Sequence, residues 1–253
     1  MEKIDQCHST NSLLLERRTE GVLWTDYQTA GRGQAGNGWE SEKGKNILLS
    51  VGVANPPVAV DQQWRMSMLF SLVVWETIAA LTDETKLTVK WPNDIYYDDR
   101  KLAGILIEHC LKGQKIAYSV LGIGLNVNQQ EWKGTAPNPV SLLQITGQEW
   151  DREKIVEDLW QRWQAGLPLL QDEPKLKALY MAHLYRRKGL FPFVEREVNT
   201  TPTMNASSGT EGQFMASIED VSPTGELILR DDRGTIRKYH FKQIRYVVNT
   251  DGK

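Results

Sequence analysis

A glycine-rich loop between two apolar segments is the feature that most constrains how this chain can fold. The loop runs from Tyr27 to Trp39 and contains four glycines and one arginine, Arg32. The apolar segments on either side of it, 22–27 and 46–53, both read as strands. Glycines let backbone N–H groups approach a phosphate or carboxylate, and arginine adds a planar charged group that binds oxyanions. We therefore predict an anion-binding loop that connects two strands.

The loop also matches the dinucleotide-binding fingerprint, with glycines at positions 31, 33 and 36. That fingerprint should open a helix whose N-terminus holds the pyrophosphate. Residues 37–45 are instead poor in helix formers and lead into a strand, which argues against a Rossmann-type oxidoreductase. No Gly-Lys-Ser/Thr occurs at Walker spacing either. Taken alone, the loop could still be an ordinary surface loop.

The charge and cysteine content exclude several other classes of protein. With 30 basic and 32 acidic residues the formal net charge is −2, which gives no bulk reason to expect nucleic-acid or membrane binding. Cys7 and Cys110 form no C-x-x-C pair, so neither a disulfide framework nor a structural zinc site is indicated. The first residues lack signal-peptide character, and the longest apolar stretch, 66–75, is too short to span a bilayer. We expect a soluble cytoplasmic protein.

Periodicity along the chain predicts an α+β region followed by a β region. A helix should start at 9–11, a long buried helix should span 61–81, and another helix should lie within 151–170. After Arg187 the apolar residues alternate between turns, which is typical of a small β-barrel or sandwich. We therefore expect two domains, 1–187 and 188–253, with a mobile polar loop at 199–213. Further strands are predicted at 87–90, 102–109, 116–127, 214–218, 227–229 and 244–248.

Three more polar or glycine-bearing strand ends accompany the loop. They are Lys-Trp-Pro-Asn-Asp at 90–94, Lys-Leu-Ala-Gly-Ile-Leu-Ile-Glu at 101–108, and Gly-x-Gly-x-Asn-x-Asn at 122–128. Each has a plain structural explanation, such as a packed tryptophan beside a turn or a β-bulge. Four such ends in one domain predict a binding site.

The ordered set of motifs resembles the biotin protein ligase family, which attaches biotin to a lysine of carboxylase carrier domains. The resemblance covers Ser-Thr-Asn at 9–11, Tyr-Gln-x-x-Gly-Arg-Gly at 27–33, the three motifs above, and a tail that looks like the family's SH3-like C-terminal domain. It implies an α+β catalytic domain with a mixed β-sheet flanked by helices, as in class II aminoacyl-tRNA synthetases and lipoate ligases. A small SH3-like β-barrel should follow.

The resemblance also implies a two-step ATP-dependent reaction. Biotin and ATP, with Mg²⁺, should give biotinyl-5′-AMP and pyrophosphate, and the lysine of a biotin carboxyl carrier domain should then take the biotin and release AMP. Two anions must meet in the first step, so fixed positive charge is needed, whereas a carboxylate needs no general base. The four histidines, which show no metal-ligand spacing, fit that chemistry. The enzyme is expected to act as a monomer or homodimer, without nucleic acid or membrane.

By the same resemblance, each motif residue acquires an expected role. Arg32 and Lys101 should be catalytic, and Asp94 should bind Mg²⁺. The expected biotin contacts are Ser9, Thr10, Asn11, Gln28, Arg32, Gly33, Gln34, Lys101 and Gly104. The expected ATP and adenylate contacts are Arg32, Trp39, Lys90, Asn93 and Asn126.

The sequence departs from the family pattern at Gln34, where many members carry a second arginine. We expect Gln34 to donate to the intermediate but to hold it less tightly. Because Ser9 lies within the first ten residues, we expect the monofunctional form that lacks a helix-turn-helix domain. Two alternatives stay open: a lipoate or octanoate transferase with the same fold, and a biotin- or nucleotide-binding sensor without catalysis. The Ser-Thr-Asn and Gln28 group favours the ureido ring of biotin, and retention of the charged residues favours an enzyme.

Overall fold

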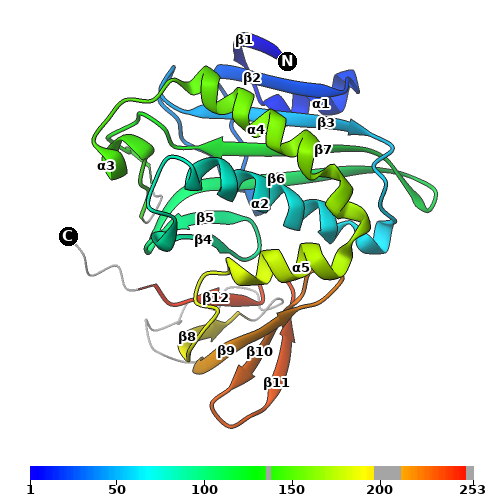
Figure 1. Ribbon diagram of the computed structural model, residues 1–253, viewed down its shortest axis with the longest axis vertical. Coiled ribbons are helices and arrows are strands. Elements are labelled where there is room, and N and C mark those ends of the chain that lie inside the picture. Colours follow the sequence, from blue (N-terminus) through cyan, green and yellow to red (C-terminus); the bar gives the residue numbers. More distant parts are fainter. Residues whose placement is uncertain (135–137, 197–211, 249–253) are drawn as a thin grey trace, which may run out of the picture.

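The computed structural model describes residues 1–134, 138–196 and 212–248, which form two β-sheets and the helices packed against them (Figure 1). The larger sheet is seven-stranded and mixed, in the order β1-β2-β3-β7-β6-β5-β4. Only its β1–β2 pair is parallel. The expected mixed sheet with flanking helices is therefore confirmed. Its strands are β1 (Glu2–Cys7), β2 (Gly21–Gln28), β3 (Ile47–Ala54), β4 (Leu87–Lys90), β5 (Asp94–Tyr97), β6 (Arg100–Lys112) and β7 (Lys115–Leu125).

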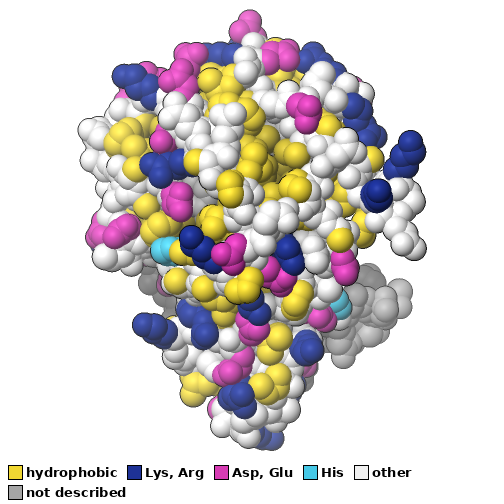
Figure 2. Space-filling view, turned by 45° about the vertical axis from the view of Figure 1, so that its right-hand side comes forward, with side chains coloured by type: hydrophobic (Ala, Val, Ile, Leu, Met, Phe, Trp, Pro, Cys, Tyr) yellow, Lys and Arg dark blue, Asp and Glu magenta, His cyan; other side chains and the backbone are white. Residues whose placement is uncertain are grey.

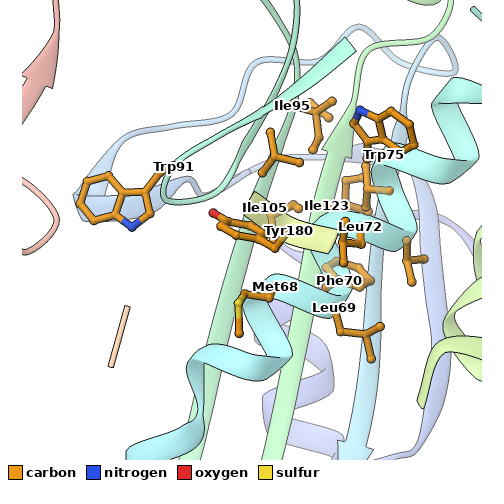
Figure 3. Close-up of a cluster of buried hydrophobic side chains, with 14 of the residues drawn as sticks. Met68, Leu69, Phe70, Leu72, Trp75, Trp91, Ile95, Ile105, Ile123 and Tyr180 are labelled. Carbon is orange, nitrogen blue, oxygen red and sulfur yellow. The ribbon is translucent and has the colours of Figure 1, made fainter. Parts of the chain in front are cut away.

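One face of this sheet carries the main hydrophobic core. Helices α2 (Trp64–Ala79) and α4 (Arg152–Gly166) cover it, and α5 (Glu173–Ala182) lies between the two sheets (Figure 1). In Figure 3, Phe70 and Leu72 of α2 belong to the same buried cluster as Ile123 of β7. The Phe70 ring meets that of Trp163 edge-on, at 5.7 Å between ring centres. The helix expected at 61–81 begins later, at Trp64, after a 3₁₀ turn at Val60–Gln62.

The opposite face is covered at one end by the short helix α1 (Thr10–Arg17). Ser9 is its N-cap and accepts a hydrogen bond from the backbone N–H of Ser12 at 3.4 Å. A small apolar cluster that includes Leu14 and Val120 holds the helix down. On this face beside α1, β3 and β7 carry Ser50 opposite Gly122, and the next pair is Leu48 opposite Gly124. Because Ser50 and the two glycines carry so little side-chain volume, the sheet surface stays open beside the start of α1.

The second sheet is five-stranded and antiparallel, in the order β11-β10-β9-β8-β12. It confirms the β region expected after residue 187, although β8 and β11 were not predicted. The indole N–H of Trp91 donates to the backbone oxygen of Gly225 at 2.9 Å and so joins this sheet to the first. The expected loop at 199–213 lies, up to residue 211, outside the described residues. The strands are β8 (Phe191–Glu195), β9 (Gln213–Val221), β10 (Leu227–Asp231), β11 (Ile236–Tyr239) and β12 (Ile244–Tyr246).

The surface agrees with the near-zero net charge. Figure 2 shows basic and acidic side chains interspersed over the face in view. Within the described ranges, no helix has both the length and the apolar character needed to cross a membrane. The remaining short helix, α3 (Leu142–Thr146), carries a complete capping box between Ser141 and Gln144.

Candidate active site

The open face of the larger sheet holds a small cavity of about 50 Å³ beneath the glycine loop. All nine residues predicted for biotin line it, together with three of the five predicted for the nucleotide, of which Arg32 belongs to both sets. Its walls come from the start of α1, the end of β2, the glycine loop and strands β6 and β7. The predicted site residues in these walls are Ser9, Thr10, Asn11, Gln28, Arg32, Gly33, Gln34, Trp39, Asn93, Lys101 and Gly104.

Glycines shape the floor of this cavity. A Cβ atom at Gly122 would collide with the side chain of Asn11, and one at Gly124 would collide with the indole of Trp39. A Cβ at Gly104 would lie 2.8 Å from the same indole, closer than real Cβ contacts come. Side chains alternate between the faces of a strand, so these glycines bring loop and helix side chains down onto the sheet without disturbing the core behind it.

The polar groups at the α1 end have fixed orientations. Oε1 of Gln28 accepts hydrogen bonds from the backbone N–H of Thr10 at 2.7 Å and from its hydroxyl at 3.1 Å. The amide oxygen of Gln28 is thus engaged, and its Nε2 is the group left for a ligand. Gln28 therefore offers a hydrogen-bond donor, which suits a carbonyl acceptor.

Asn11 makes three side-chain hydrogen bonds within the protein. Its Nδ2 donates to the backbone oxygen of Leu106 at 3.0 Å and to Glu108 at 2.9 Å, and its Oδ1 accepts from the Ser50 hydroxyl at 2.6 Å. Both amide protons are used, so in this geometry Asn11 has a structural role and connects α1 to the strands. Its expected contact with biotin stays a prediction.

Two cationic side chains reach the same cavity. Arg32 Nη2 lies 2.6 Å from Glu108 Oε2, and Lys101 Nζ lies 2.7 Å from Asp94 Oδ1. Lys101 Nζ is also 5.5 Å from the centre of the Trp39 ring. All of these side chains are partly exposed, so a negatively charged ligand could exchange with the carboxylates at moderate energetic cost.

A larger cavity of about 880 Å³ adjoins the first and shares Gln28, Trp39 and Lys101 with it. Asn126, predicted for the adenylate, lines this second cavity, and its Nδ2 donates to the backbone oxygen of Val140 at 3.1 Å. The indole N–H of Trp39 is buried and has no hydrogen-bond partner among the described residues. A polar group of a ligand could satisfy that donor.

Lys90 lines neither cavity. Its ammonium lies 3.0 Å from the hydroxyl of Tyr96 and 5.2 Å from the ring centre of Tyr246, which belongs to the second sheet. Burial lowers the pKa of Lys90 to about 8, although the nearby carboxylate of Asp94 opposes the shift. The expected contact of Lys90 with ATP stays a prediction, and the structure places this lysine among tyrosines.

The described residues contain no group of three or more His, Cys, Asp or Glu side chains that could hold a metal ion. Asp94, the predicted Mg²⁺ ligand, is paired with Lys101. This arrangement does not fit a metal held by the protein alone. A Mg²⁺ ion bound mainly by substrate phosphates needs only one or two carboxylates, so the role of Asp94 stays a prediction.

Sequence reasoning gave no role to Ser50, Glu108 or Glu40. Ser50 is fully buried in an otherwise apolar strand, and that exception was the available signal. Glu108 ends a motif that the sequence already singled out. Glu40 accepts hydrogen bonds from the backbone N–H groups of Lys133 and Gly134, both at 2.7 Å, and nothing local in the sequence indicates that contact.

Known proteins share both the sequence pattern and the fold. A model of the biotin/lipoate A/B protein ligase family matches residues 5–126. A biotin–[acetyl-CoA-carboxylase] ligase of Mycobacterium tuberculosis is 35% identical over 191 residues, which are 72% of this chain and 70% of that protein. The bifunctional ligase/repressor BirA of Salmonella typhimurium is 34% identical over 75% of this chain and 59% of its own length.

The fold agrees with that relationship. The structure of a biotin protein ligase from Aquifex aeolicus in complex with biotin and ATP superposes with a TM-score of 0.74, at 22% identity, over 97% of this chain and 98% of that one. The superposition shows that the fold is shared, and the family assignment rests on the sequence identity with the Mycobacterium relative. The chain belongs to the biotin protein ligase family.

Proposed function

We propose that this protein activates biotin with ATP as biotinyl-5′-adenylate and then transfers the biotin to a lysine of a biotin carboxyl carrier domain. One observation carries the proposal: Arg32 and Lys101 line the same glycine-floored cavity as the oriented amide of Gln28. A ligand with a polar ring at one end and a carboxylate at the other fits these two kinds of group. Family membership supports the same reaction.

In the proposed pose, the ureido carbonyl of biotin accepts from Gln28 Nε2, and the biotin carboxylate lies between Arg32 and Lys101. The adenylate occupies the larger cavity beside Trp39 and Asn126. Gln34 lies at the first cavity and can meet the intermediate there, since its side-chain oxygen is buried and has no partner among the described residues. Compounds with lipoate's dithiolane ring would leave the Gln28 donor unpaired, which disfavours the lipoate alternative.

The chemistry then follows from charge. The biotin carboxylate oxygen forms a bond to the α-phosphorus of ATP, and the bond from that phosphorus to the pyrophosphate oxygen breaks. Both reactants are anions, so Arg32 and Lys101 lower the barrier by holding positive charge where negative charge develops. Mg²⁺ bound with ATP would neutralise phosphate charge. In the second step the carrier lysine attacks the biotinyl carbonyl, AMP leaves, and an amide forms.

The remaining expectations are part of this proposal and rest on the sequence patterns and on the family resemblance. We assign 1–187 to catalysis and 188–253 to the C-terminal β domain, with a carboxylase carrier domain as the acceptor. The proposal also includes Mg²⁺ dependence, a cytoplasmic location, a monomeric or homodimeric state and action without nucleic acid.

The test is pyrophosphate exchange into ATP with biotin, with lipoate or with neither, followed by incubation with a biotin carboxyl carrier domain. We expect exchange only with biotin, and a mass increase of one biotin on the carrier. Exchange with lipoate alone would replace the biotin assignment, and biotin binding without exchange would favour the sensor alternative.

A further inference from the structure

Glu108 joins the glycine loop to the sheet, and neither step of the proposed reaction uses it. It lies on β6, and one of its oxygens, Oε2, accepts from Asn11 Nδ2 at 2.9 Å and from Arg32 Nη2 at 2.6 Å. Its side chain is about a quarter exposed (27%), so a carboxylate can stay charged there. A single oxygen thus meets donors from α1 and from the loop.

The backbone N–H groups of Thr29 and Ala30 attach the start of the loop to Cys7 and His8, whereas the backbone hydrogen bonds of residues 31–39 are internal among the described residues. The backbone N–H of Gly33 donates to the oxygen of Asn37 at 2.7 Å, and that of Trp39 donates to the oxygen of Gly31 at 3.0 Å. Arg32 and Gly38 form a β-bridge within the loop. Among the described residues, the Arg32–Glu108 pair is the only salt bridge made by residues 31–39. Glu108 is therefore the ionic tether of the loop.

The geometry of the pair leaves Arg32 usable. Only Nη2 contacts Glu108, and the described residues supply no acceptor for Nε or Nη1. Arg32 nevertheless lines the smaller cavity. Arginine carries five donors in a fixed planar arrangement, so fixing one nitrogen orients the other donors. The contact thus sets the direction of the guanidinium and leaves donors free for a ligand.

The same carboxylate also reaches the other end of the site. Asn11, which donates to Glu108, accepts from Ser50, and the Ser50 hydroxyl also lies 2.7 Å from that of Thr10. Thr10 in turn fixes Gln28. One continuous chain of polar contacts therefore links the residue proposed for the biotin carboxylate with the residue proposed for the ureido ring.

We propose that Glu108 is a positioning residue for adenylation, which holds the Arg32 guanidinium in the orientation that the biotin carboxylate requires. The inference rests on the proposed function. It predicts that Glu108 acts through Arg32, so removing the carboxylate matters only while the guanidinium is present. A misplacement of about 1 Å near a reacting group can lower a rate about 100-fold, and we expect at least about a 10-fold loss here.

A double-mutant cycle tests this, with kcat/KM for biotin measured by pyrophosphate exchange in Glu108→Ala, Arg32→Ala and the double variant. We expect Glu108→Ala to lose about 10-fold or more, Glu108→Gln to lose less because its amide oxygen still accepts, and the double variant to match Arg32→Ala within about twofold. The control is Glu219→Ala, which removes a partly exposed arginine–glutamate pair with Arg230 in the second sheet. That control should behave as the parent.

Equal losses of kcat/KM from Glu108→Ala with and without Arg32 would overturn the inference. A higher kcat/KM in Glu108→Ala would also overturn it, because the carboxylate would then compete with the ligand for Arg32. A second readout needs no substrate. Limited proteolysis of the free protein should cut within 31–45 faster in Glu108→Ala than in the parent or Glu219→Ala. Equal cleavage rates would show that Glu108 does not hold the loop. If the parent showed no biotin-dependent exchange, the proposed function would fail, and the proteolysis would still decide whether Glu108 holds the loop.

Discussion

The two faces of the seven-stranded sheet are built from the same strands but from different kinds of residue. On the helix-covered face, Val51 of β3 and Leu121 of β7 are fully buried in the main core. On the other face, Ser50 and Gly122 lie next to them in the chain and sit beneath α1 and the cavity. Because successive side chains point to opposite faces, one strand can supply stability on one face and a binding site on the other.

This difference predicts separable effects of substitution. Changes on the helix-covered face should alter the free energy of unfolding and leave ligand binding alone. Changes on the cavity face should alter binding or catalysis and leave stability nearly unchanged.

The largest effect should follow from Phe70→Ala on the helix-covered face. Phe70 is fully buried against Trp163, so its loss should lower the free energy of unfolding by about 3–5 kcal/mol. Urea denaturation measures this, and Phe70→Leu, which keeps most of the volume, should lose less. The KM for biotin of the folded fraction should match the parent, and a raised KM would break the separation of the two faces.

The next effect belongs to Lys101→Ala on the cavity face. Its charge matters most in the transition state, so kcat for adenylation should fall about 100- to 1,000-fold while biotin binding changes little. Single-turnover adenylation at saturating ATP measures the rate. Lys112→Ala, at the exposed end of the same strand, is the control. Weak biotin binding with a normal rate at saturation would refute this role of Lys101.

Lys90 tests the part of the larger sheet where its ammonium lies between Tyr96 of β5 and Tyr246 of the second sheet. Its folded-state pKa, about 8, lies below the ordinary value of 10.5, so the unfolded chain binds the proton more tightly between these values. The free energy of unfolding should therefore increase by about 2–3 kcal/mol as the pH rises from 8 to 10.5. Below pH 8 this contribution should be absent. Urea denaturation at several pH values should show the rise in the parent and its loss in Lys90→Met. Parallel curves for the two proteins would contradict the assignment.

The smallest effect should come from Glu40→Gln at the mouth of the larger cavity. The carboxylate holds the backbone N–H groups of Lys133 and Gly134, and its neutral replacement should weaken that contact by about 1 kcal/mol. Hydrogen exchange of these two amides should quicken several-fold, with the global stability unchanged. Glu42→Gln, whose carboxylate has no hydrogen bond or salt bridge among the described residues, is the matched control. Unchanged exchange at residues 133 and 134 would show that the two loops are held by other contacts.

Sequence patterns predicted the interior of the fold better than its edges. The apolar segments that became β2, β3, β6, β7 and α2 were all predicted, since burial imposes a visible pattern on them. The edge strand β1 was missed because it turns mostly exposed side chains to solvent, so it shows too few buried positions for a strand pattern to be recognised. Strand β5 was missed although three of its four residues are buried, because it begins at the last residue of the 90–94 motif, which we interpreted as a strand end and a turn.

Most residues that line the smaller cavity belong to short motifs that the sequence shows, whereas contacts between distant segments could not be predicted. The glycine loop and Lys101 fall within local motifs, whereas the pair between Arg32 and Glu108 spans 76 positions. Lys90 shows the same limit, because its tyrosine neighbour Tyr246 comes from the second sheet. A motif reveals which groups are available, and the tertiary contacts decide which of them remain free for a ligand.

The most direct test of the two-face account is the dissociation constant of biotin for a pair of variants in one strand, measured by isothermal titration calorimetry. Gly124→Ala places a methyl group where Trp39 lies, and Leu121→Ala removes a fully buried core side chain from the opposite face. The account predicts that Gly124→Ala weakens biotin binding by at least about 10-fold, or about 1.4 kcal/mol, while Leu121→Ala binds biotin as the parent does. Equal weakening in both variants, or weakening in Leu121→Ala alone, would contradict it.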